Sequence, residues 1–368
     1  MYRKIILFLF LCFCISDFAF AQETLVAVDS SKLYRDIESF SKKRKSTNFI
    51  YRIFFNPVAV SPALQTKTKK KKNLQKPCSA FEGKIIRGIH ITTLDPFGYT
   101  AADTAVATQN TLSKAGNKLH IKSQSITIRN LLLIHKNEPL DSLLVKESER
   151  LIRTQKYVNE VFFYVVSAGA DSVDIFIREL DKWSIIPKGA ISTSSYTIDL
   201  TDKNFLGFGH EFQNVFTRNY TAGNYSFNTN YSIPNIRNTY ISTALHYGID
   251  ANKNISRSLA VDRPFFSPFA KWAAGFFVSQ QFQNNSVHGS DSVLVTQNIK
   301  YNVWDYWAGN AQQIFKGNTE DERTTNLILT GRFFRIRYLE KPLEIYDSLH
   351  LYSNEDFYLS GIGISRRK

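Results

Sequence analysis

The feature that most constrains this chain is a series of long segments, all after Trp183, in which hydrophobic and polar residues alternate. In Asn224–Ile233 the alternation is unbroken, with aromatic residues and isoleucine on one face against asparagine and serine on the other. Successive side chains of a strand point to opposite faces, so this pattern predicts strands with one apolar and one polar face. Further strands are expected at Ile185–Ile198, Thr239–Ile249, Ser258–Phe266, Lys271–Phe282, Val295–Trp307 and Asn326–Leu339.

These segments favour strands that cross a membrane. They run to roughly 8–14 residues, which suits tilted membrane-spanning strands better than the shorter strands of soluble sheets. The chain is also 14% aromatic. Aromatic residues near the ends of the segments are expected to form the girdles at the two membrane interfaces, namely Tyr240, Phe265, Phe266, Trp272, Trp304 and Trp307. The alternative is a soluble β-sandwich, whose strands would be shorter and whose exposed faces would be richer in lysine and glutamate.

The first 21 residues have the layout of a secretory signal peptide. The basic start Met1–Lys4 precedes a short apolar run, Ile5–Ile15, and Phe18–Ala21 offers an Ala-x-Ala cleavage site. The apolar run is too short to span a bilayer comfortably. Cleavage would leave Cys78 as the single cysteine, so no internal disulfide is expected. The sequence therefore predicts an exported protein.

Residues 22–80 are expected to form a flexible basic lead-in. Proline, serine and lysine interrupt any regular period, and Lys67–Lys76 contributes six lysines to a net charge of +14. No aromatic residues interleave with these lysines, and an exported chain rarely meets nucleic acid, so no nucleic-acid partner is expected. A solvated tether is the favoured interpretation, and contact with anionic lipid headgroups is the alternative.

Residues 81–183 combine helical and strand periods. The expected order is a strand, two helices and two strands, at Lys84–Thr92, Ser125–His135, Asp141–Tyr157, Glu160–Val166 and Ser172–Arg178. Such an order gives one small sheet covered by a helix pair. In the second helix, apolar residues at three- and four-residue spacing form one stripe, with Asp141 as the N-cap.

From Phe81 to Lys368 the chain resembles the outer-membrane assembly factor superfamily (BamA/TamA-like), in particular its surface antigens with a single POTRA domain. In the first part the resemblance rests on Ile126–Leu133, Asn137-Glu138, Glu147–Arg153, Tyr157-Val158 and Glu179–Trp183. In the second part it rests on Asp202–Gly209, Asp262–Phe266, Lys271–Gly275 and Asp305–Trp307. It implies an α+β POTRA-like periplasmic domain at 81–183 and an all-β, antiparallel portion of a transmembrane barrel at 184–368.

The resemblance also assigns a role to the stretch Asp202–His210. It looks like the corner after the first barrel strand, formed by Asn204, Phe205, Leu206, Gly207 and Gly209. The two glycines are expected to let the strand bend, because they permit a tight turn and a close backbone approach. The two apolar residues are expected to meet lipid or the barrel rim.

The function implied by the resemblance is assistance in the insertion or translocation of proteins at the outer membrane. An incoming chain would add as a strand to an exposed sheet edge. The implied partners are outer-membrane lipids, unfolded or secreted client proteins bound at the POTRA edge strand, and accessory lipoproteins. A passive or substrate-selective pore and a dedicated secretion translocator are the alternatives. No cofactor is expected.

Two departures from the family concern the end of the sequence. Family barrels have about sixteen strands, whereas roughly nine are expected here, and the chain ends within an alternating run, Gly361–Lys368. The family's Arg-Gly loop, carried by a later strand pair, is also absent from these residues. We therefore expect a sequence truncated within the barrel.

An enzymatic role is not expected from the sequence. Its seven histidines are scattered singly, and it contains neither a Gly-x-Ser-x-Gly motif nor a phosphate-binding loop. The acidic groups Glu179 with Asp181, and Glu320–Glu322, are interpreted as solvated charge. Neither catalytic nor metal-binding residues are predicted.

Overall fold

A computed structural model describes residues 78–103, 110–288, 294–317, 319–347 and 350–366. All of them belong to the second of two compact units, which runs from Gln75 to Lys368. The predicted signal peptide, and the predicted lead-in up to residue 77, lie outside the described residues.

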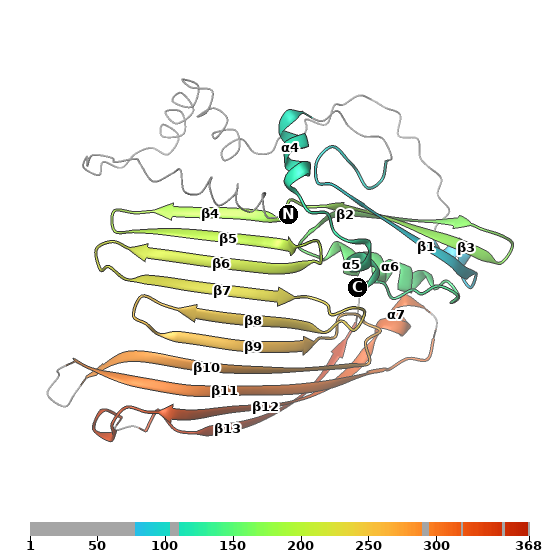
Figure 1. Ribbon diagram of the computed structural model, residues 1–368. Helices are drawn as coiled ribbons and strands as arrows, with labels where there is room; N and C mark the ends of the chain where they lie inside the picture. The colour runs from blue at the N-terminus through green and yellow to red at the C-terminus, as the bar shows by residue number, and fades with distance from the viewer. Residues whose placement is uncertain (1–77, 104–109, 289–293, 318, 348–349, 367–368) are drawn as a thin grey trace, which may run out of the picture. The chain divides into compact units, whose positions relative to one another are not determined.

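Residues 78–183 form a small domain built on a three-stranded sheet (Figure 1). Its strands are β1 (Ile85–Leu94), β2 (Val158–Ser167) and β3 (Ser172–Asp181). The order is β1-β3-β2, with β3 parallel to β1 and antiparallel to β2. Its helices are η1 (Cys78–Phe81), α4 (Thr111–Leu119), α5 (Ser125–Arg129) and α6 (Ser142–Arg153). Of the helices described here, none is both long enough and apolar enough to cross a membrane.

The predicted strand–helix–helix–strand–strand order is found, with two differences. The first predicted helix, Ser125–His135, is a single turn that ends at Arg129, and α4 precedes it where no helix was predicted. The second predicted helix is α6, and Asp141 caps it, because its Oδ1 accepts hydrogen bonds from the backbone N–H groups of Leu143 (2.9 Å) and Leu144 (3.3 Å).

The core of the small domain lies between its sheet and its helices. The buried face of β3 contributes Val173, Ile175 and Ile177, and the helices contribute residues such as Ile128 and Ile152. All five are fully buried. Residues of the stripe that the 3.6-residue period predicted on α6 thus lie in the same core cluster as the face that the two-residue period predicted on β3.

The rest of the described chain forms a large sheet of ten strands, each antiparallel to the next in sequence (Figure 1). The strands are β4 (Ile185–Ile191), β5 (Ser195–Phe205), β6 (His210–Asn219), β7 (Tyr225–Ile233), β8 (Ser242–Ile249), β9 (Ile255–Arg263), β10 (Trp272–His288), β11 (Leu294–Gln313), β12 (Asn326–Glu340) and β13 (Glu355–Ser365). A short helix, α7 (Glu320–Thr324), lies between β11 and β12, and η2 (Glu344–Tyr346) follows β12. Strands β4 and β13 are the two edges of the sheet.

The beginning of the large sheet differs from its prediction. The segment Ile185–Ile198 was predicted as one strand, but it is divided between β4 and β5. Four hydroxyl residues, Ser192–Ser195, make the turn: the backbone N–H of Ser192 donates to the Ser195 carbonyl (2.8 Å), and the Ser192 hydroxyl accepts from the Ser195 N–H (3.0 Å). Short hydroxyl side chains compete for backbone hydrogen bonds in this way and so favour turns over strands.

The strand register divides the large sheet into a polar and an apolar face, as the alternation predicted. Directly paired residues share a face. The polar face of the middle strands carries Asn228, Asn230, His246, Ser256, Ser258 and Asp262, and the apolar face carries Phe227, Tyr231, Leu245, Leu259, Val261, Phe276 and Val278. On the polar face, the His246 ring contacts Asn230 Oδ1 (2.7 Å) and Ser256 Oγ (2.9 Å).

Candidate functional site at the joint between the two sheets

The stretch Asp202–His210 forms the joint between the small domain and the large sheet. It connects β5 to β6 and therefore follows the second strand of the large sheet. The prediction had placed it after the first strand. The backbone turns sharply because Leu206, Gly207 and Gly209 all have positive φ angles, of 57°, 78° and 71°. Glycine adopts such angles without steric cost, which explains two of these positions.

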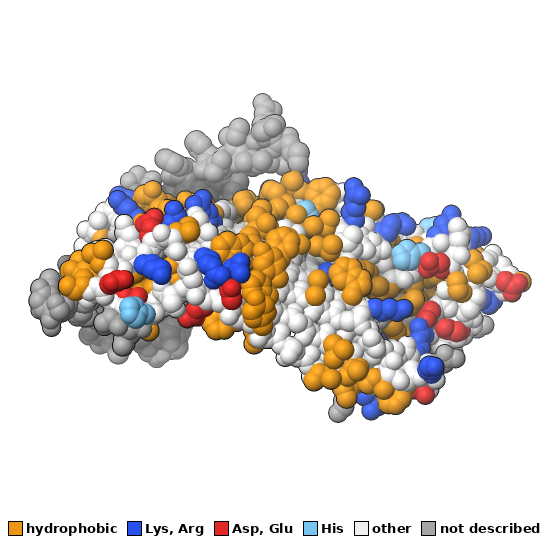
Figure 2. All heavy atoms as spheres, turned by 90° about the horizontal axis from the view of Figure 1, so that it is seen from below, with side chains coloured by type: hydrophobic (Ala, Val, Ile, Leu, Met, Phe, Trp, Pro, Cys, Tyr) orange, Lys and Arg blue, Asp and Glu red, His pale blue; other side chains and the backbone are white. Residues whose placement is uncertain are grey.

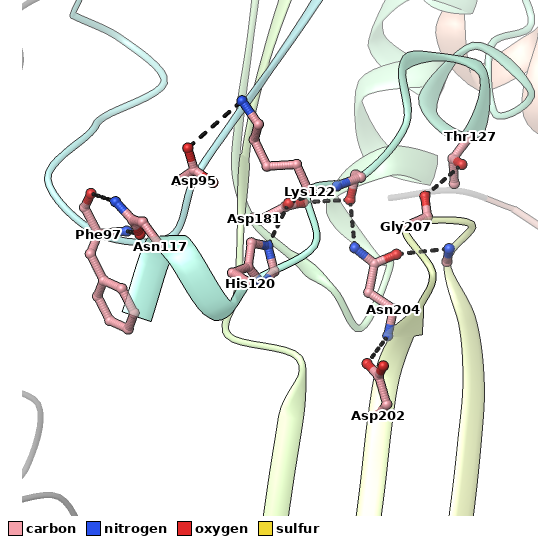
Figure 3. A network of polar contacts seen from close by, with 12 residues as sticks. Asp95, Phe97, Asn117, His120, Lys122, Thr127, Asp181, Asp202, Asn204 and Gly207 are labelled. Carbon is pink, nitrogen blue, oxygen red and sulfur yellow. Dashed lines mark hydrogen bonds and ion pairs between the residues drawn. The ribbon is translucent and has the colours of Figure 1, made fainter. Parts of the chain in front are cut away.

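Both glycines of the corner also lie against the small domain. A Cβ on Gly207 would be 2.3 Å from the backbone oxygen of Lys122, and one on Gly209 would be 2.6 Å from the ring of Tyr157. The Gly207 carbonyl accepts hydrogen bonds from the Gln124 N–H (2.9 Å) and the Thr127 hydroxyl (3.0 Å) (Figure 3). The glycines predicted to bend the strand therefore also allow it to dock.

Asn204 connects the corner to the small domain through its buried amide. Its Nδ2 donates to the Ser123 hydroxyl (3.0 Å), and its Oδ1 accepts from the Gly209 N–H (2.8 Å) (Figure 3). The side chain of Asp202 accepts from the Asn204 N–H (3.0 Å). The Asn204 side chain thus holds the turn closed and also joins it to the segment before α5.

Asp181, at the end of β3, is linked to Asn204 through the Ser123 hydroxyl and is fully buried. One of its carboxylate oxygens accepts from the Ser123 N–H (2.8 Å) and contacts His120 Nε2 (2.8 Å), and the other accepts from the Ser123 hydroxyl. We call His120, Ser123, Asp181 and Asn204 the joint network. Low local dielectric makes such hydrogen bonds strong when all partners are present and makes the loss of one partner costly.

Glu179 lies beside the joint network, two residues before Asp181. It is fully buried, and neither of its carboxylate oxygens has a hydrogen-bond partner in the part of the chain that the structure describes. Burial, followed by the nearby negative charge of Asp181, raises the pKa of Glu179 to about 10. The side chain therefore carries a proton at neutral pH. Burial and the same two carboxyl groups also raise the pKa of Tyr157.

The interpretation of Glu179 and Asp181 as solvated charge is wrong, since both side chains are fully buried. Their signal was present in the sequence: they continue the parity of Val173, Ile175 and Ile177, which is the core-facing parity of β3. In the other acidic group, Glu320–Glu322, Glu320 contacts Lys146 on α6 (2.8 Å). This contact helps to hold the small domain to the large sheet.

The joint network does not have the arrangement of a nucleophilic site. Ser123 and His120 both contact Asp181, whereas a catalytic serine would contact the histidine. Ser123 is 2% exposed and His120 is 8% exposed, so neither is open to a substrate. Within the described ranges there is also no group of three or more His, Cys, Asp or Glu side chains placed to hold a metal ion. The arrangement supports a mechanical role.

Three further loops of the large sheet contact the helices of the small domain. We call this end of the sheet, where β5 meets β6, the near end. In the β7–β8 loop, Asn235 Nδ2 donates to the Asn130 carbonyl (2.8 Å). In the β9–β10 loop, the Phe266 carbonyl accepts from Arg150 on α6 (2.8 Å). On α7, Arg323 pairs with Asp141 (2.6 Å). The helices therefore face the large sheet along much of its near end.

The predicted interface aromatics occupy several different environments. Tyr240 is 9% exposed, its hydroxyl donates to the Leu132 carbonyl (3.1 Å), and its ring stacks on Phe266 with centroids 3.7 Å apart. These two rings lie where the β7–β8 and β9–β10 loops meet the small domain, so their prediction as girdle residues is wrong. Sequence alternation identifies aromatic residues near strand ends but not a covering domain.

Strand parity separates the remaining four aromatics. Trp307 lies on the polar face, where its Nε1 donates to Asp262 (3.0 Å), and the Phe265 ring packs against Gly309 on that same face. Trp272 and Trp304 have the opposite parity and lie on the apolar face. Of the six residues, these two therefore lie on the apolar face, and their role in a girdle stays a prediction.

Both sheets present open edges in the described chain. β2 pairs with β3 alone, and its outer edge meets no other described strand. The first residues of β1 are covered, because Ile86 exchanges backbone hydrogen bonds with Asn137 (2.8 Å) and Glu138 (2.9 Å). Edge strands offer rows of unpaired N–H and C=O groups to another chain.

Comparisons with known proteins gave matches at the level of structure. No family model and no curated protein matches the sequence. Among solved structures, BamA from Haemophilus ducreyi lacking POTRA domains 1–3 matches at 15% identity and a TM-score of 0.34, over 70% of this chain and 57% of that chain. CdiB from Acinetobacter baumannii matches at 11% identity and a TM-score of 0.36, over 94% and 67%. CdiB from Escherichia coli matches at 10% identity and a TM-score of 0.37, over 86% and 69%.

The chain is similar to BamA and CdiB. This chain spans only 57% of the length of that BamA structure. At these identities and TM-scores the likeness carries no information about function, which has to come from the residues of this chain.

Proposed function

We propose that this chain belongs to an outer-membrane β-barrel protein whose small domain is a periplasmic POTRA-type domain, and that it assists insertion or translocation of other proteins by strand addition. The observation that carries the proposal is the open outer edge of β2 in a domain held at the near end of a two-faced sheet. A client chain arriving in extended form can pair its backbone with this edge.

The two faces of the large sheet support the membrane part of the proposal. A sheet can face hydrocarbon only if its backbone groups are paired and its side chains on that face are apolar. Leu245, Leu259, Val278 and Phe276 lie on neighbouring strands of the apolar face. Leu245 is 50% exposed and Phe276 is 36% exposed, so apolar surface faces outward. Lipid contact would make this exposure favourable.

Strand addition needs no cofactor or nucleotide, because backbone pairing and burial of client side chains supply the free energy. The face of the small sheet opposite its core adds a surface for client side chains. There the rings of His90, Phe176 and Tyr164 stack across all three strands, with centroids 4.7 and 5.0 Å apart. An aromatic row that crosses the strands and ends at the open edge suits extended chains of varied sequence.

The alternative function is a passive or substrate-selective pore. The polar face of the large sheet favours an open pore over a barrel whose interior is sealed. A hollow on that face is lined by Asp262, Asp305, Trp307 and Arg332, among other residues. Asp305 accepts from Arg332 Nε (2.8 Å), and Asp262 accepts from Trp307. Charged and hydrogen-bonded side chains of this kind suit a water-filled lumen.

Depletion of the protein from its cell distinguishes these functions. An assembly role predicts lower levels of many outer-membrane β-barrel proteins in quantitative mass spectrometry of the membrane fraction. Unchanged levels together with altered solute uptake would contradict it and favour the pore. Loss of a single secreted protein would favour a dedicated translocator.

A cross-linking experiment tests the edge itself. A photoactivatable side chain at Val166, which lies on β2 and is 46% exposed, should cross-link an unfolded β-barrel precursor added to the purified protein. The matched control is Arg153 on α6, whose side chain is 62% exposed. Equal labelling from the two positions, or labelling from neither, would overturn strand addition at β2.

A further inference from the structure

Near the end of its apolar face, the large sheet carries a row of polar side chains that runs across four neighbouring strands. Arg257 pairs directly with Gln280, Gln280 with Asn302, and Asn302 with Arg337, on β9, β10, β11 and β12 in turn. We call these four residues, with Arg335 and Asp356 beside them, the arginine row. Direct pairing places all four on one face, at one level across the sheet.

The arginine row is built from connected hydrogen bonds. Arg257 donates to Gln280 Oε1, and Gln280 Nε2 donates to Asn302 Oδ1 (2.9 Å). At the other end, Asp356 accepts from Arg337 Nη2 (2.8 Å) and from Arg335 through Nε (2.9 Å) and Nη2 (3.0 Å). These contacts fix the guanidinium groups, and Arg337 Nη1 also donates to the backbone oxygens of Ile336 (2.9 Å) and Glu355 (3.1 Å). Each arginine has further N–H donors, since a guanidinium carries five.

The arginine row lies close to the end of the apolar residues of β10. On β10, the apolar face carries Trp272, Phe276 and Val278, and Gln280 follows them. Gln280 is eight positions after Trp272, about 26 Å along the strand at ~3.3 Å per residue. A strand tilted as in membrane barrels covers roughly 20 Å of bilayer over that length, close to the height of the apolar band of such barrels.

Beyond the arginine row, the apolar face continues for one more level on β9 and β10, where Ile255 pairs with Phe282. After that level the hairpin is largely polar: Gln283 and Asn284 are consecutive on β10, and Thr296, Gln297 and Asn298 are consecutive on β11. We call this end of the sheet the far end. Figure 2 shows, on the side of β12 and β13, hydrophobic side chains gathered in a band, with charged side chains on its left, toward the far end. The row therefore lies one level inside the end of the apolar face, close to where hydrocarbon would give way to headgroups.

The charge of the arginine row is positive and exposed. It contains three arginines and one aspartate, and Arg218 lies at the far end of the same face on β6. The side chains of Arg335 and Arg337 are 41% and 31% exposed, and Arg257 is exposed. At the near end, by contrast, Arg263 donates to the backbone oxygens of Thr239 (3.1 Å) and Trp272 and packs on the Trp272 ring. The cationic surplus lies on one side of the apolar band.

We propose that the arginine row binds the phosphate groups of an anionic lipid in the membrane leaflet at the far end of the sheet. This inference rests on the proposed membrane location of the apolar face. Planar guanidinium groups bind phosphate oxygens through two parallel hydrogen bonds, and Arg is preferred over Lys where such geometry matters. In the proposed orientation, with the small domain in the periplasm, the far end faces the outer leaflet. The ligand class is a phosphorylated lipid.

The test uses the full-length protein reconstituted into vesicles of phosphatidylcholine, either alone or with a minor fraction of lipid A, and native mass spectrometry of retained lipid. The double variant Arg257→Gln with Arg337→Gln should reduce lipid A retention by about tenfold or more, since each lost hydrogen bond to a charged group is worth that order. The matched control is Arg237→Gln, the same change at an exposed position of the β7–β8 loop.

The outcomes separate this inference from the proposed function. Integration into vesicles with equal lipid A retention by the double variant and the wild type would overturn the arginine row as a site and leave the barrel proposal intact. Equal loss in Arg237→Gln, or equal retention of dephosphorylated lipid A, would also overturn it. If millimolar inorganic phosphate displaced lipid A completely, the site would bind free phosphate and not a lipid. Failure to integrate at all would contradict both proposals.

Discussion

At the scale of single residues, Gly207 tests whether the corner is docked or simply bent. Gly207 and Gly223 both have positive φ, 78° and 67°, but a Cβ would meet the Lys122 oxygen at 2.3 Å only at Gly207, and nothing within 4 Å at Gly223. Alanine at either position costs about 1–2 kcal/mol of backbone strain. Gly207→Ala should lose a further ~1–3 kcal/mol because the Lys122 backbone has to move.

Thermal unfolding of the two variants in detergent measures the difference. A clearly lower melting temperature for Gly207→Ala than for Gly223→Ala is the expected result. Equal losses would show that the corner needs glycine only for its φ angle and does not lie against the small domain.

Glu179 makes a prediction about pH. Its pKa is raised from its ordinary value of 4.5 to about 10, so the folded state keeps a proton that the unfolded state releases. The free energy of unfolding should therefore fall as the pH rises between these two values. Glu179→Gln removes this titration, so relative to the wild type it should gain stability steadily from pH 5 to pH 9, by ~1.4 kcal/mol per pH unit and about 5 kcal/mol in all.

The exposed residue Glu138 provides the control, since its side chain is 57% exposed. Melting curves of Glu138→Gln should keep the pH dependence of the wild type. If Glu179→Gln kept it as well, Glu179 would be charged in the folded protein and its surroundings more hydrated than the structure indicates.

At the scale of elements, the contact between α6 and α7 is predicted to depend on one carboxylate with two tasks. Asp141 caps α6 and accepts from Arg323 (2.6 Å). Asp141→Asn should keep the cap and lose the ion pair, at a cost of about 0.5–1 kcal/mol, whereas Asp141→Ala should cost about 1 kcal/mol more. Arg323→Ala should lose as much stability as Asp141→Asn, because each change removes the same ion pair. The double variant Asp141→Asn with Arg323→Ala should lose no more from this ion pair than either single variant does.

Changes in pH and in salt concentration provide a second test of the contact between Asp141 and Arg323. Burial alone would raise the pKa of Asp141, but the hydrogen bond and charge of Arg323 and two backbone N–H groups lower it below its ordinary value. Its contribution is therefore present above the ordinary pKa near 3.8 and lost as the pH falls through the folded value. Unfolding curves with salt should show a smaller gap between wild type and Asp141→Asn; an unchanged gap would contradict an ion pair.

The elements were largely predictable because they depend on local periods. Two-residue alternation located β7, β8, β9 and β12, and the 3.6-residue stripe located α6. Helix α4 was missed although Leu112, Ala115 and Leu119 recur at three- and four-residue spacing, because the helix is short and Gly116 and Asn117 have low helix propensity. The β4–β5 turn was missed because its serines resemble the polar positions of a strand.

At the scale of the whole molecule, the contacts between the small domain and the large sheet were not predictable. Tyr240 and Leu132 are joined by a hydrogen bond of 3.1 Å although they lie 108 positions apart in the sequence. Likewise, Asn204 and Ser123 are ordinary polar residues until the fold brings them together. The glycines of the corner were identified from the sequence, but their partners, Lys122 and Tyr157, depend on tertiary structure.

The central claim is that the large sheet spans a membrane, and gel mobility tests it most directly. The mature protein should stay in the membrane pellet after carbonate extraction, and a sample solubilised in mild detergent should migrate differently before and after boiling, because a closed barrel resists unfolding by detergent at room temperature. Release into the soluble fraction without detergent, together with one unchanged band, would contradict the claim.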